Sequence, residues 1–257
     1  MRISVITVCL NSAATLEDTI RSVASQSYAD KEHIIVDGGS TDGTLEIIGR
    51  HRAVLAKVIS EPDRGTYDAM NKGIGFASGA VVGFLNADDL FASPDCLQRI
   101  AGAFEDPATD AVYGDLVYVR QDDPDSVVRY WKSGPFRPGA FAAGWAPPHP
   151  TFYVRRRLLE QFGGFDPRFK VAGDAELAMR LLERHRVRCR YLPEVLVRMR
   201  MGGASNRSVR NVLRGNREVV QALRENGLSP RSLPGLLLHK IGRKGLEYLR
   251  AGQAKLG

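Results

Sequence analysis

Acidic and amide side chains follow a short apolar run in the first third of the chain. The run at residues 81–85 ends abruptly in Asn86, Ala87, Asp88 and Asp89. Its length and composition are typical of a buried strand, and open α/β sheets bind ligands beyond the carboxyl ends of such strands. Adjacent carboxylates repel one another unless water or a cation screens them, and a hard divalent cation binds both carboxylate and phosphate oxygens. The motif predicts a metal–diphosphate site, although a helix cap would use the same residues.

Polar residues also follow the two strand patterns that precede this one. Asp37 lies directly before two glycines, and Asp63 and Arg64 come after the third strand pattern. Because the ends of parallel strands meet at one edge of a sheet, Asp37 and Asp88 should converge there. Asp37 suits a ribose hydroxyl or the N–H edge of a base, Arg64 a phosphate or an acid, and Asp63 the nucleoside or Arg64. Taken singly, each of these residues could equally be structural.

Two more candidates lie in the second half of the chain. Asp174 begins a helix pattern, where the helix N-terminus stabilises the carboxylate that a proton acceptor requires, or where it could serve as a cap. His149 stands between two prolines, after a Gly- and Pro-rich segment at residues 133–150 that contains Trp145. His149 is a candidate acceptor or metal contact, and Trp145 suits a sugar face or a lipid chain.

The elements that must position these residues alternate between strand and helix in the first half. Strand patterns occupy residues 3–9, 33–36, 54–59 and 81–85, and helix patterns occupy 13–26, 44–50 and 67–77. This order predicts a mostly parallel sheet with helices on both faces. The second half is less regular, with a strand pattern at 111–119, a long loop at 133–150 and helix patterns at 174–183, 207–224 and 236–249.

Composition indicates a globular protein with reduced thiols. The 257 residues are 44% hydrophobic and 25% charged, and no uncharged run approaches the length of a membrane span. The chain begins with a strand pattern instead of a signal-peptide layout, and its three cysteines are far apart without metal-ligand spacing. These features favour a cytoplasmic location.

The net charge of +7 is unevenly distributed. Residues 184–257 carry a net charge of +13, whereas residues 1–183 carry −6. Such a basic tail suggests an anionic partner, either a membrane surface, a diphosphate or a nucleic acid, although a solvated helical surface would have the same composition. No recognised nucleic-acid motif accompanies these charges, so we expect no nucleic-acid partner.

Together, these residues resemble the GT-A glycosyltransferases of family 2 over roughly residues 1–200. The matching motifs lie at residues 5–11, 35–44, 86–89 and 163–166, and at Gly173-Asp174 with Leu177 and Arg180. Residues 61–73 are similar to a subgroup that acts in bacterial polysaccharide and glycolipid assembly. The resemblance implies a GT-A, Rossmann-like α/β fold with a mostly parallel central sheet, helices on both faces and basic C-terminal helices.

The resemblance also implies a division of the chain. Residues 1–205 would form the catalytic domain, with 1–110 as the nucleotide-sugar-binding half and 111–205 as the acceptor-binding half. Residues 206–257 would form a basic helical extension. From the excess of positive charge in this tail, we expect it to dock on an anionic membrane surface, on the inner face of the plasma membrane. The oligomeric state stays open.

Family roles carry over by position. Asp37 matches the acid that binds the base, Asp88 the metal-binding acid of the D-x-D motif, and Asp174 the general base. The nucleotide-sugar-binding residues would be Val8, Leu10, Asp37, Asp63, Arg64, Asn71, Asn86 and Ala87. From the chemistry of the leaving diphosphate, we expect Arg64 or tail arginines such as Arg198 and Arg200 to add positive charge. The cofactor would be Mn²⁺ or Mg²⁺.

Three residues depart from the family pattern. Asn86 stands where the first acid of D-x-D is usual, Gly38 replaces a common second acid after Asp37, and Gly173 replaces the Glu that often precedes the base. The predicted activity is transfer of a sugar, with inversion, from a nucleotide-diphosphate sugar to a hydroxyl of a glycan or lipid-linked acceptor. GDP-, UDP- and dTDP-sugars all remain open, and the alternatives are a non-catalytic nucleotide-sugar-binding protein and a sugar nucleotidyltransferase.

Overall fold

The strands form one sheet whose order follows chain order only in part. The computed structural model describes residues 1–202 and 209–229, so the helix expected at 236–249 lies outside the described residues. The described strands form a sheet in the order β3-β2-β1-β4-β8-β6-β9-β5, with β7 paired to β6. Their bounds are β1 (Ile3–Cys9), β2 (Lys31–Asp37), β3 (Lys57–Ser60), β4 (Val81–Phe84), β5 (Leu90–Phe91), β6 (Ala111–Val119), β7 (Val127–Trp131), β8 (Tyr153–Arg155) and β9 (Cys189–Arg200).

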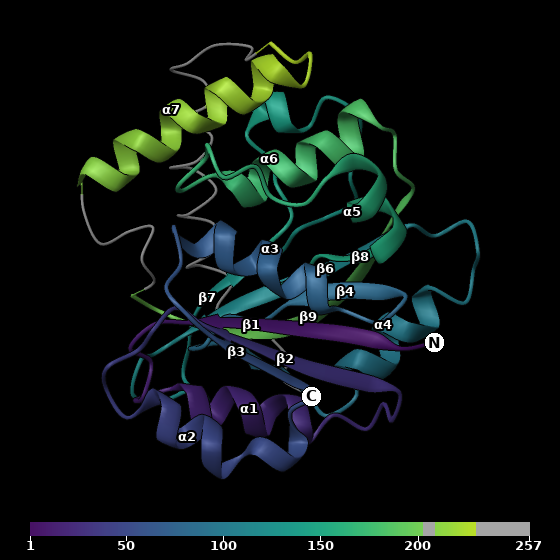
Figure 1. Cartoon of the computed structure of the whole chain (residues 1–257). Coiled ribbons are helices and arrows are strands. Elements are labelled where there is room, and N and C mark those ends of the chain that lie inside the picture. Colours follow the sequence, from purple (N-terminus) through teal and green to yellow (C-terminus); the bar gives the residue numbers. More distant parts are fainter. Residues whose placement is uncertain (203–208, 230–257) are drawn as a thin grey trace.

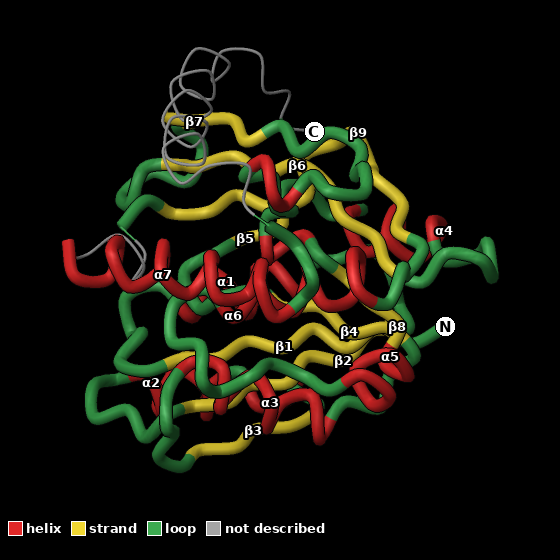
Figure 2. Tube along the Cα trace, turned by 90° about the horizontal axis from the view of Figure 1, so that it is seen from above, coloured by secondary structure: helices red, strands yellow, loops and turns green. Residues whose placement is uncertain are grey.

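Helices cover both faces of this sheet, as the α/β prediction required. The helices are α1 (Leu16–Ala24), α2 (Thr44–Arg50), α3 (Thr66–Phe76), α4 (Cys96–Ala103), α5 (Arg156–Phe162), α6 (Gly173–Met179) and α7 (Val209–Glu225). In Figure 1, α1 and α2 lie below the strands, whereas α3, α5, α6 and α7 lie above them. Viewed from above in Figure 2, α7 lies over α6, which it contacts.

The parallel strands bring their carboxyl ends into line. β1 pairs in parallel with both β2 and β4, and β2 pairs in parallel with β3. In this register Cys9 lies opposite Asp37, and Asp37 lies opposite Ser60. The segments that follow β1, β2 and β3 therefore begin side by side at one edge, which confirms the mostly parallel arrangement in this part of the sheet.

The second half of the sheet is mixed. β8 is antiparallel to β4 and β6, β7 is antiparallel to β6, and β9 runs parallel to β6 but antiparallel to β5. Sequence patterns did not anticipate β7, β8, β9, α4 or α5. The short β8 shows too little alternation to be recognised, and the arginines of β9 hide its apolar positions.

Several predicted boundaries need correction. The strand expected at 54–59 begins only at Lys57, because Arg52–Val54 forms a 3₁₀ turn. The helix expected at 174–183 changes after Met179 into a π-helical turn over Arg180–Arg184. The segment 133–150 was expected to be a plain loop, but it contains a 3₁₀ turn at Phe141–Ala143 and the start of another at His149–Thr151.

Apolar side chains pack against both faces of the sheet. One cluster lies between the sheet and α3, α5 and α6, and a second lies below β1 and β2 against α1 and α2. Gly83 in β4 has no side chain because the ring of Tyr153, from the neighbouring β8, occupies the space that a Cβ would need. In the described part of the chain, no helix is long and apolar enough to cross a membrane.

Candidate active site

Asp37 is held inside a tight turn after β2. It is completely buried, and its Oδ2 accepts hydrogen bonds from the Gly39 and Ser40 amides at 3.1 Å each and from the Ser60 hydroxyl at 2.8 Å. The Ser40 hydroxyl donates to the other oxygen, Oδ1. Burial alone would raise the pKa of Asp37, but the hydrogen bonds from Ser40, Ser60 and Gly39 outweigh it and hold the pKa below its usual value. Asp37 is therefore an ionised carboxylate whose oxygens are engaged by protein donors.

The end of β1 lies beside this turn. Val8 is half-buried, and Leu10, just past the strand, is 59% exposed. A Cβ built on Gly38 would lie 3.6 Å from the Leu10 side chain, so the exposed leucine borders the Asp37 turn. An exposed apolar side chain at a strand end provides a surface that a flat ring can cover.

The missing acid at position 38 has a structural explanation. A Cβ on Gly38 would lie only 2.8 Å from Oδ2 of Asp63, so the carboxylate of Asp63 occupies the space that a side chain at 38 would need. Lys72 holds Asp63 in place, with its Nζ 2.6 Å from Asp63 Oδ1. Asp63 thus brings a carboxylate to the same turn from β3. Arg64, by contrast, is 87% exposed and pairs with Asp68 of α3.

The motif after β4 divides into a buried and a half-buried acid. Asp89 is completely buried and accepts a hydrogen bond from the Asn86 side-chain amide at 2.8 Å. Burial and the negative charge of Asp88 raise the pKa of Asp89 well above its usual value, opposed by the Asn86 bond. Asn86 supplies a donor here, whereas an acid would set a second carboxylate against a buried one. Asp88 itself is half-buried, and Ala87 is buried.

Arg200 holds the same loop from behind. Its guanidinium donates to the Asp88 carbonyl at 3.1 Å and to the Asp18 carboxylate at 2.7 Å, and the residue is only 4% exposed. Arg198 bonds to Asp125 and to the backbone of the segment after β5. We expected both arginines to add charge near a diphosphate. Arg200 contacts the loop that carries Asp88 and Arg198 contacts the segment after β5, and the expectation stays a prediction.

A tyrosine from α3 holds Asp174 at the start of α6. The Tyr67 hydroxyl lies 3.3 Å from Asp174 Oδ1 and 3.0 Å from the Val171 carbonyl. Burial and the negative charge of Asp174 raise the pKa of Tyr67 well above its usual value, so the hydroxyl remains a donor. A Cβ on Gly173 would lie 2.7 Å from the Tyr67 ring. The usual glutamate before the base would therefore collide with this ring.

Glu218 of α7 fixes the segment that precedes Asp174. Its carboxylate accepts hydrogen bonds from three consecutive backbone amides, those of Lys170 (3.0 and 3.1 Å), Val171 (2.8 Å) and Ala172 (2.9 Å). Burial would raise the pKa of Glu218, but these bonds and one from Arg214 outweigh it and keep the pKa low.

Neither Tyr67 nor Glu218 was expected from the sequence. Nothing in the local pattern distinguishes Tyr67 from an ordinary core residue. Glu218 stands one helical turn before Ala222 and two turns before Asn226, but the burial of these two residues is known only from the structure. A charged residue in phase with buried positions requires a partner inside the protein.

Aromatic rings connect the end of β4 with Asp174. Phe84 packs edge-on against Phe165 at 5.1 Å, and Phe165 stacks on Tyr67 at 5.2 Å between ring centroids. The His149 ring stacks on Phe84 at 5.4 Å, and its Nε2 is out of solvent with no hydrogen-bond partner in the described residues. Burial lowers the pKa of His149, opposed by the charge of Asp174. His149 therefore lies between the β4 end and the Asp174 region.

Two other predicted site residues make contacts within the protein. The Asn71 amide donates to the Phe165 carbonyl and accepts from the Phe165 amide, both at 2.8 Å. The Trp145 indole donates to the Ser133 carbonyl at 2.8 Å. Asn71 thereby positions a ring of the aromatic connection, and Trp145 bonds back to the first residue of the 133–150 segment.

The acids near Asp88 suit a divalent cation that is also bound by a substrate diphosphate. Within residues 1–202 and 209–229, no group of three or more His, Cys, Asp or Glu side chains could hold a metal ion. Magnesium is commonly held by one or two carboxylates together with substrate phosphates. Asp88 is half-buried and so fits a cation that arrives with a diphosphate, but not an all-protein metal cage.

Comparison with known proteins places the chain among sugar-transferring enzymes. The family model for "Glycosyl transferase family 2" matches residues 4–170. A PGL/p-HBAD biosynthesis glycosyltransferase of Mycobacterium bovis BCG is 33% identical over 208 residues, which cover 79% of this chain and 78% of that protein. An uncharacterized glycosyltransferase of Mycobacterium tuberculosis H37Rv is 35% identical over 180 residues, or 69% and 68% of the two chains.

Solved structures share the fold at low sequence identity. S. aureus TarS 1-349 in complex with UDP-GlcNAc has a TM-score of 0.67 at 19% identity, covering 95% of this chain and 72% of that one. The match to a longer TarS chain covers only 43% of that chain. The mannosyltransferase PcManGT of Pyrobaculum calidifontis, in complex with GDP-Man and Mn²⁺, has a TM-score of 0.66 at 22% identity, covering 98% and 73%. The chain therefore belongs to glycosyl transferase family 2 and has the GT-A fold.

Proposed function

We propose that this glycosyltransferase moves a sugar, with inversion, from a nucleotide-diphosphate sugar to a hydroxyl of a glycan or a lipid-linked acceptor. The observation that carries the proposal is the chain of ring contacts from Phe84 through Phe165 to Tyr67. These contacts link Asp174, which bonds to Tyr67, with the end of β4, which precedes Asp88. Among the similar proteins, TarS binds UDP-GlcNAc, PcManGT binds GDP-Man, and a mycobacterial relative is named for PGL/p-HBAD biosynthesis. These similarities support a nucleotide-sugar donor and a glycolipid acceptor for this chain too.

Asp174 is the proposed general base. It accepts a proton from the acceptor hydroxyl as that oxygen attacks the anomeric carbon from the face opposite the leaving diphosphate. Tyr67 donates a hydrogen bond to Asp174 and keeps its own proton because burial raises its pKa. A single displacement of this kind inverts the configuration at the anomeric carbon.

The turns after β2, β3 and β4 are the proposed donor site. In this proposal Asp37 and Asp63 contact the nucleoside, and Leu10 and Val8 lie beside the base. Asn86 and Ala87 line the donor site after β4. Asp88 would bind Mn²⁺ or Mg²⁺ together with the diphosphate, and the bound cation neutralises charge on the leaving group.

The acceptor side is proposed to be formed by residues 111–205, with 1–110 as the donor half. The segment 133–148 leads directly into His149, which lies beside the Asp174 region, and it carries Trp145, which suits a sugar ring or a lipid chain. The basic extension at 206–257 would bring the enzyme to an anionic membrane surface, on the cytoplasmic side.

A donor-binding and turnover assay tests this proposal. Thermal unfolding is measured with UDP, GDP and dTDP, each with and without Mn²⁺, and hydrolysis or transfer is then measured with the sugar donor whose nucleotide binds. We expect one nucleotide to raise the melting temperature and Mn²⁺ to increase the shift, because a ligand that binds the folded state stabilises it. Asp88→Asn should lose the Mn²⁺-dependent part of the shift. Nucleotide binding without turnover over a broad acceptor screen would instead favour the non-catalytic alternative.

A further inference from the structure

One face of α7 is basic and exposed, with an apolar side chain in its middle. Arg210, Arg214 and Arg217 recur at helical spacing, and Leu213 lies on the same side of the helix among them. Leu213 is 56% exposed, and its neighbour Val212 is 45% exposed. We call Arg210, Leu213, Arg214 and Arg217 the outer face of α7.

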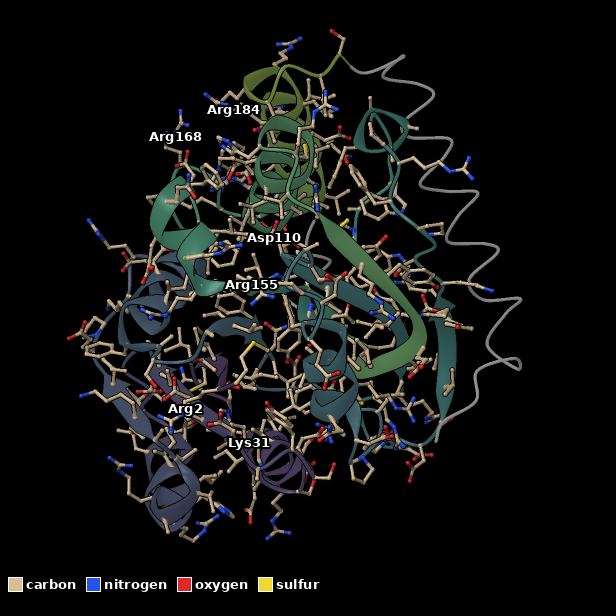
Figure 3. The ribbon with its side chains drawn as sticks, turned by 90° about the vertical axis from the view of Figure 1, so that its right-hand side faces the viewer. Arg2, Lys31, Asp110, Arg155, Arg168 and Arg184 are labelled. Atoms are coloured by element: carbon tan, nitrogen blue, oxygen red, sulfur yellow. The ribbon has the colours of Figure 1, made fainter. Side chains whose placement is uncertain are left out.

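The charges of this outer face are only partly compensated. Arg214 pairs with Glu218 at 3.0 Å. Among the described residues, Arg210 and Arg217 form no ion pair with an acid. Figure 3 places the labelled Arg168 and Arg184 in the upper part of the molecule, where α6 and α7 lie, and Arg168 pairs with Glu225 near the end of α7. Arg210 and Arg217 therefore present positive charge beside the exposed Leu213, whereas Arg168 is paired with acids.

We propose that the outer face of α7 docks on anionic phospholipid headgroups at a membrane surface. This inference rests on the proposed function, because a lipid-linked acceptor requires the enzyme at such a surface. Guanidinium groups bind phosphate with two parallel hydrogen bonds, and an apolar side chain between them can enter the boundary between headgroups and acyl chains. A soluble phosphate would use the arginines but leave the exposed leucine without a role.

The inner face of α7 contacts the segment before Asp174, so docking of α7 would also affect the active site. Glu218 binds the amides of residues 170–172, directly before Asp174. A membrane that holds α7 thus also holds the segment that positions the base. The enzyme would then be fixed with its acceptor side close to the lipid surface, through contacts separate from the donor turns.

Vesicle sedimentation with matched variants tests the docking. The full chain is compared with Arg210→Gln/Leu213→Ser/Arg217→Gln, which leaves Arg214 and Glu218 intact. The matched control is Arg21→Gln/Leu45→Ser/Arg50→Gln, which removes the same groups from exposed positions on α1 and α2, at the opposite end of the molecule in Figure 1. Both variants keep residues 230–257, so a difference between them reports on α7. Melting temperatures check that both are folded.

We expect wild-type protein to bind phosphatidylglycerol-containing vesicles but not pure phosphatidylcholine vesicles, with binding that weakens as salt rises. The α7 variant should bind at least about tenfold more weakly, since each basic side chain near an anionic surface contributes appreciably to binding. The control should bind like wild type. Wild-type binding by the α7 variant, equal losses in both variants, or equal binding of the wild type to neutral vesicles would overturn the proposal.

Donor turnover in solution separates this inference from the proposed function. Neither set of substitutions touches a residue of the donor turns or of the Asp174 region, so both variants should hydrolyse a soluble donor like wild type. Vesicle binding by a protein that turns over no donor would support docking and refute the proposed function. Turnover by a protein that binds no vesicles would refute docking alone.

Discussion

The two halves of the chain position their acids in different ways. In the first half, Asp37 is held by groups on its own turn and on the next strand, namely Gly39, Ser40 and Ser60. In the second half, Asp174 is held by Tyr67, which is 107 residues away, and its preceding segment by Glu218. A local turn can be recognised from sequence because its residues are neighbours, whereas a tertiary support cannot. Mutations in the two halves should therefore have different effects on turnover, donor affinity and stability.

The largest effect should come from Asp174→Asn. The amide keeps the size of the carboxylate and can still accept a hydrogen bond from Tyr67, but it cannot take up a proton. Turnover should fall roughly 10²- to 10⁴-fold, the usual contribution of a general base, with donor affinity nearly unchanged. Steady-state kinetics and a donor titration measure the two quantities. Asp166→Asn, which removes an acid paired with Arg168 on the same segment, is the matched control and should retain activity.

Glu218→Gln should lower turnover through position alone. The carboxylate of Glu218 has two acceptor oxygens that bind three backbone amides, whereas glutamine has only one acceptor oxygen. The segment before Asp174 should therefore loosen. We expect kcat to fall about tenfold to a hundredfold, because small displacements of catalytic groups are costly, while donor affinity stays the same. Glu225→Gln on the same helix is the control, since Glu225 bonds only to exposed side chains. Reduced stability with an unchanged kcat would mean that Glu218 supports the fold but not the base.

Asp37→Asn should show the opposite behaviour in the first half. The new side-chain amide would face hydroxyl and N–H donors, so the free energy of unfolding should fall by roughly 1–3 kcal/mol. Donor affinity should fall as well, whereas turnover at saturating donor should change little. Denaturant titrations and donor binding measure these effects. An unchanged unfolding free energy combined with a large loss of kcat would contradict the contrast between the halves.

The effect that changes activity least should be a pH dependence of stability that originates in the parallel strands. Burial lowers the pKa of His33 on β2 to about 3, and its Nε2 lies 3.0 Å from the Thr7 hydroxyl. Between pH 6.5 and 3 the unfolded chain therefore binds a proton that folded His33 does not. The free energy of unfolding should fall on acidification through this range, by up to about 1.4 kcal/mol per pH unit from this group.

Urea titrations at several pH values measure the slope, with His33→Gln as the comparison. Glutamine is neutral throughout and can place its amide near Thr7, so the variant should lose this part of the pH dependence. Other groups titrate in both proteins, and only the difference between the two slopes reports on His33. Identical slopes would show that His33 takes no part.

Much of the first half could be predicted because its patterns are local. The strand Ile3–Cys9 and the helix Thr44–Arg50 have the bounds expected from sequence, and in the second half the strand Ala111–Val119 does too. Alternating strands and helices require a parallel sheet, and a parallel sheet aligns its carboxyl ends. The prediction that Asp37 and Asp88 follow strands at one edge needed nothing more than this rule.

The three departures from the family pattern could not be explained in this way. Each is accounted for by a residue distant from it or buried beside it. Asp63 fills the space at Gly38, the Tyr67 ring fills the space at Gly173, and buried Asp89 accepts the amide of Asn86. These substitutions look like losses in the sequence, but in the structure each fits its neighbour.

By itself, the sequence determined the family, the α/β class and the edge of the sheet where polar residues gather, because periodicity and strand-end motifs are encoded by adjacent residues. The tertiary structure alone decided which acids remain accessible. Asp37 and Asp89 are completely buried, whereas Asp88 and Asp174 are only half-buried. It also decided that Glu218 of α7 supports the segment before Asp174, because contacts between residues far apart in the chain exist only after folding.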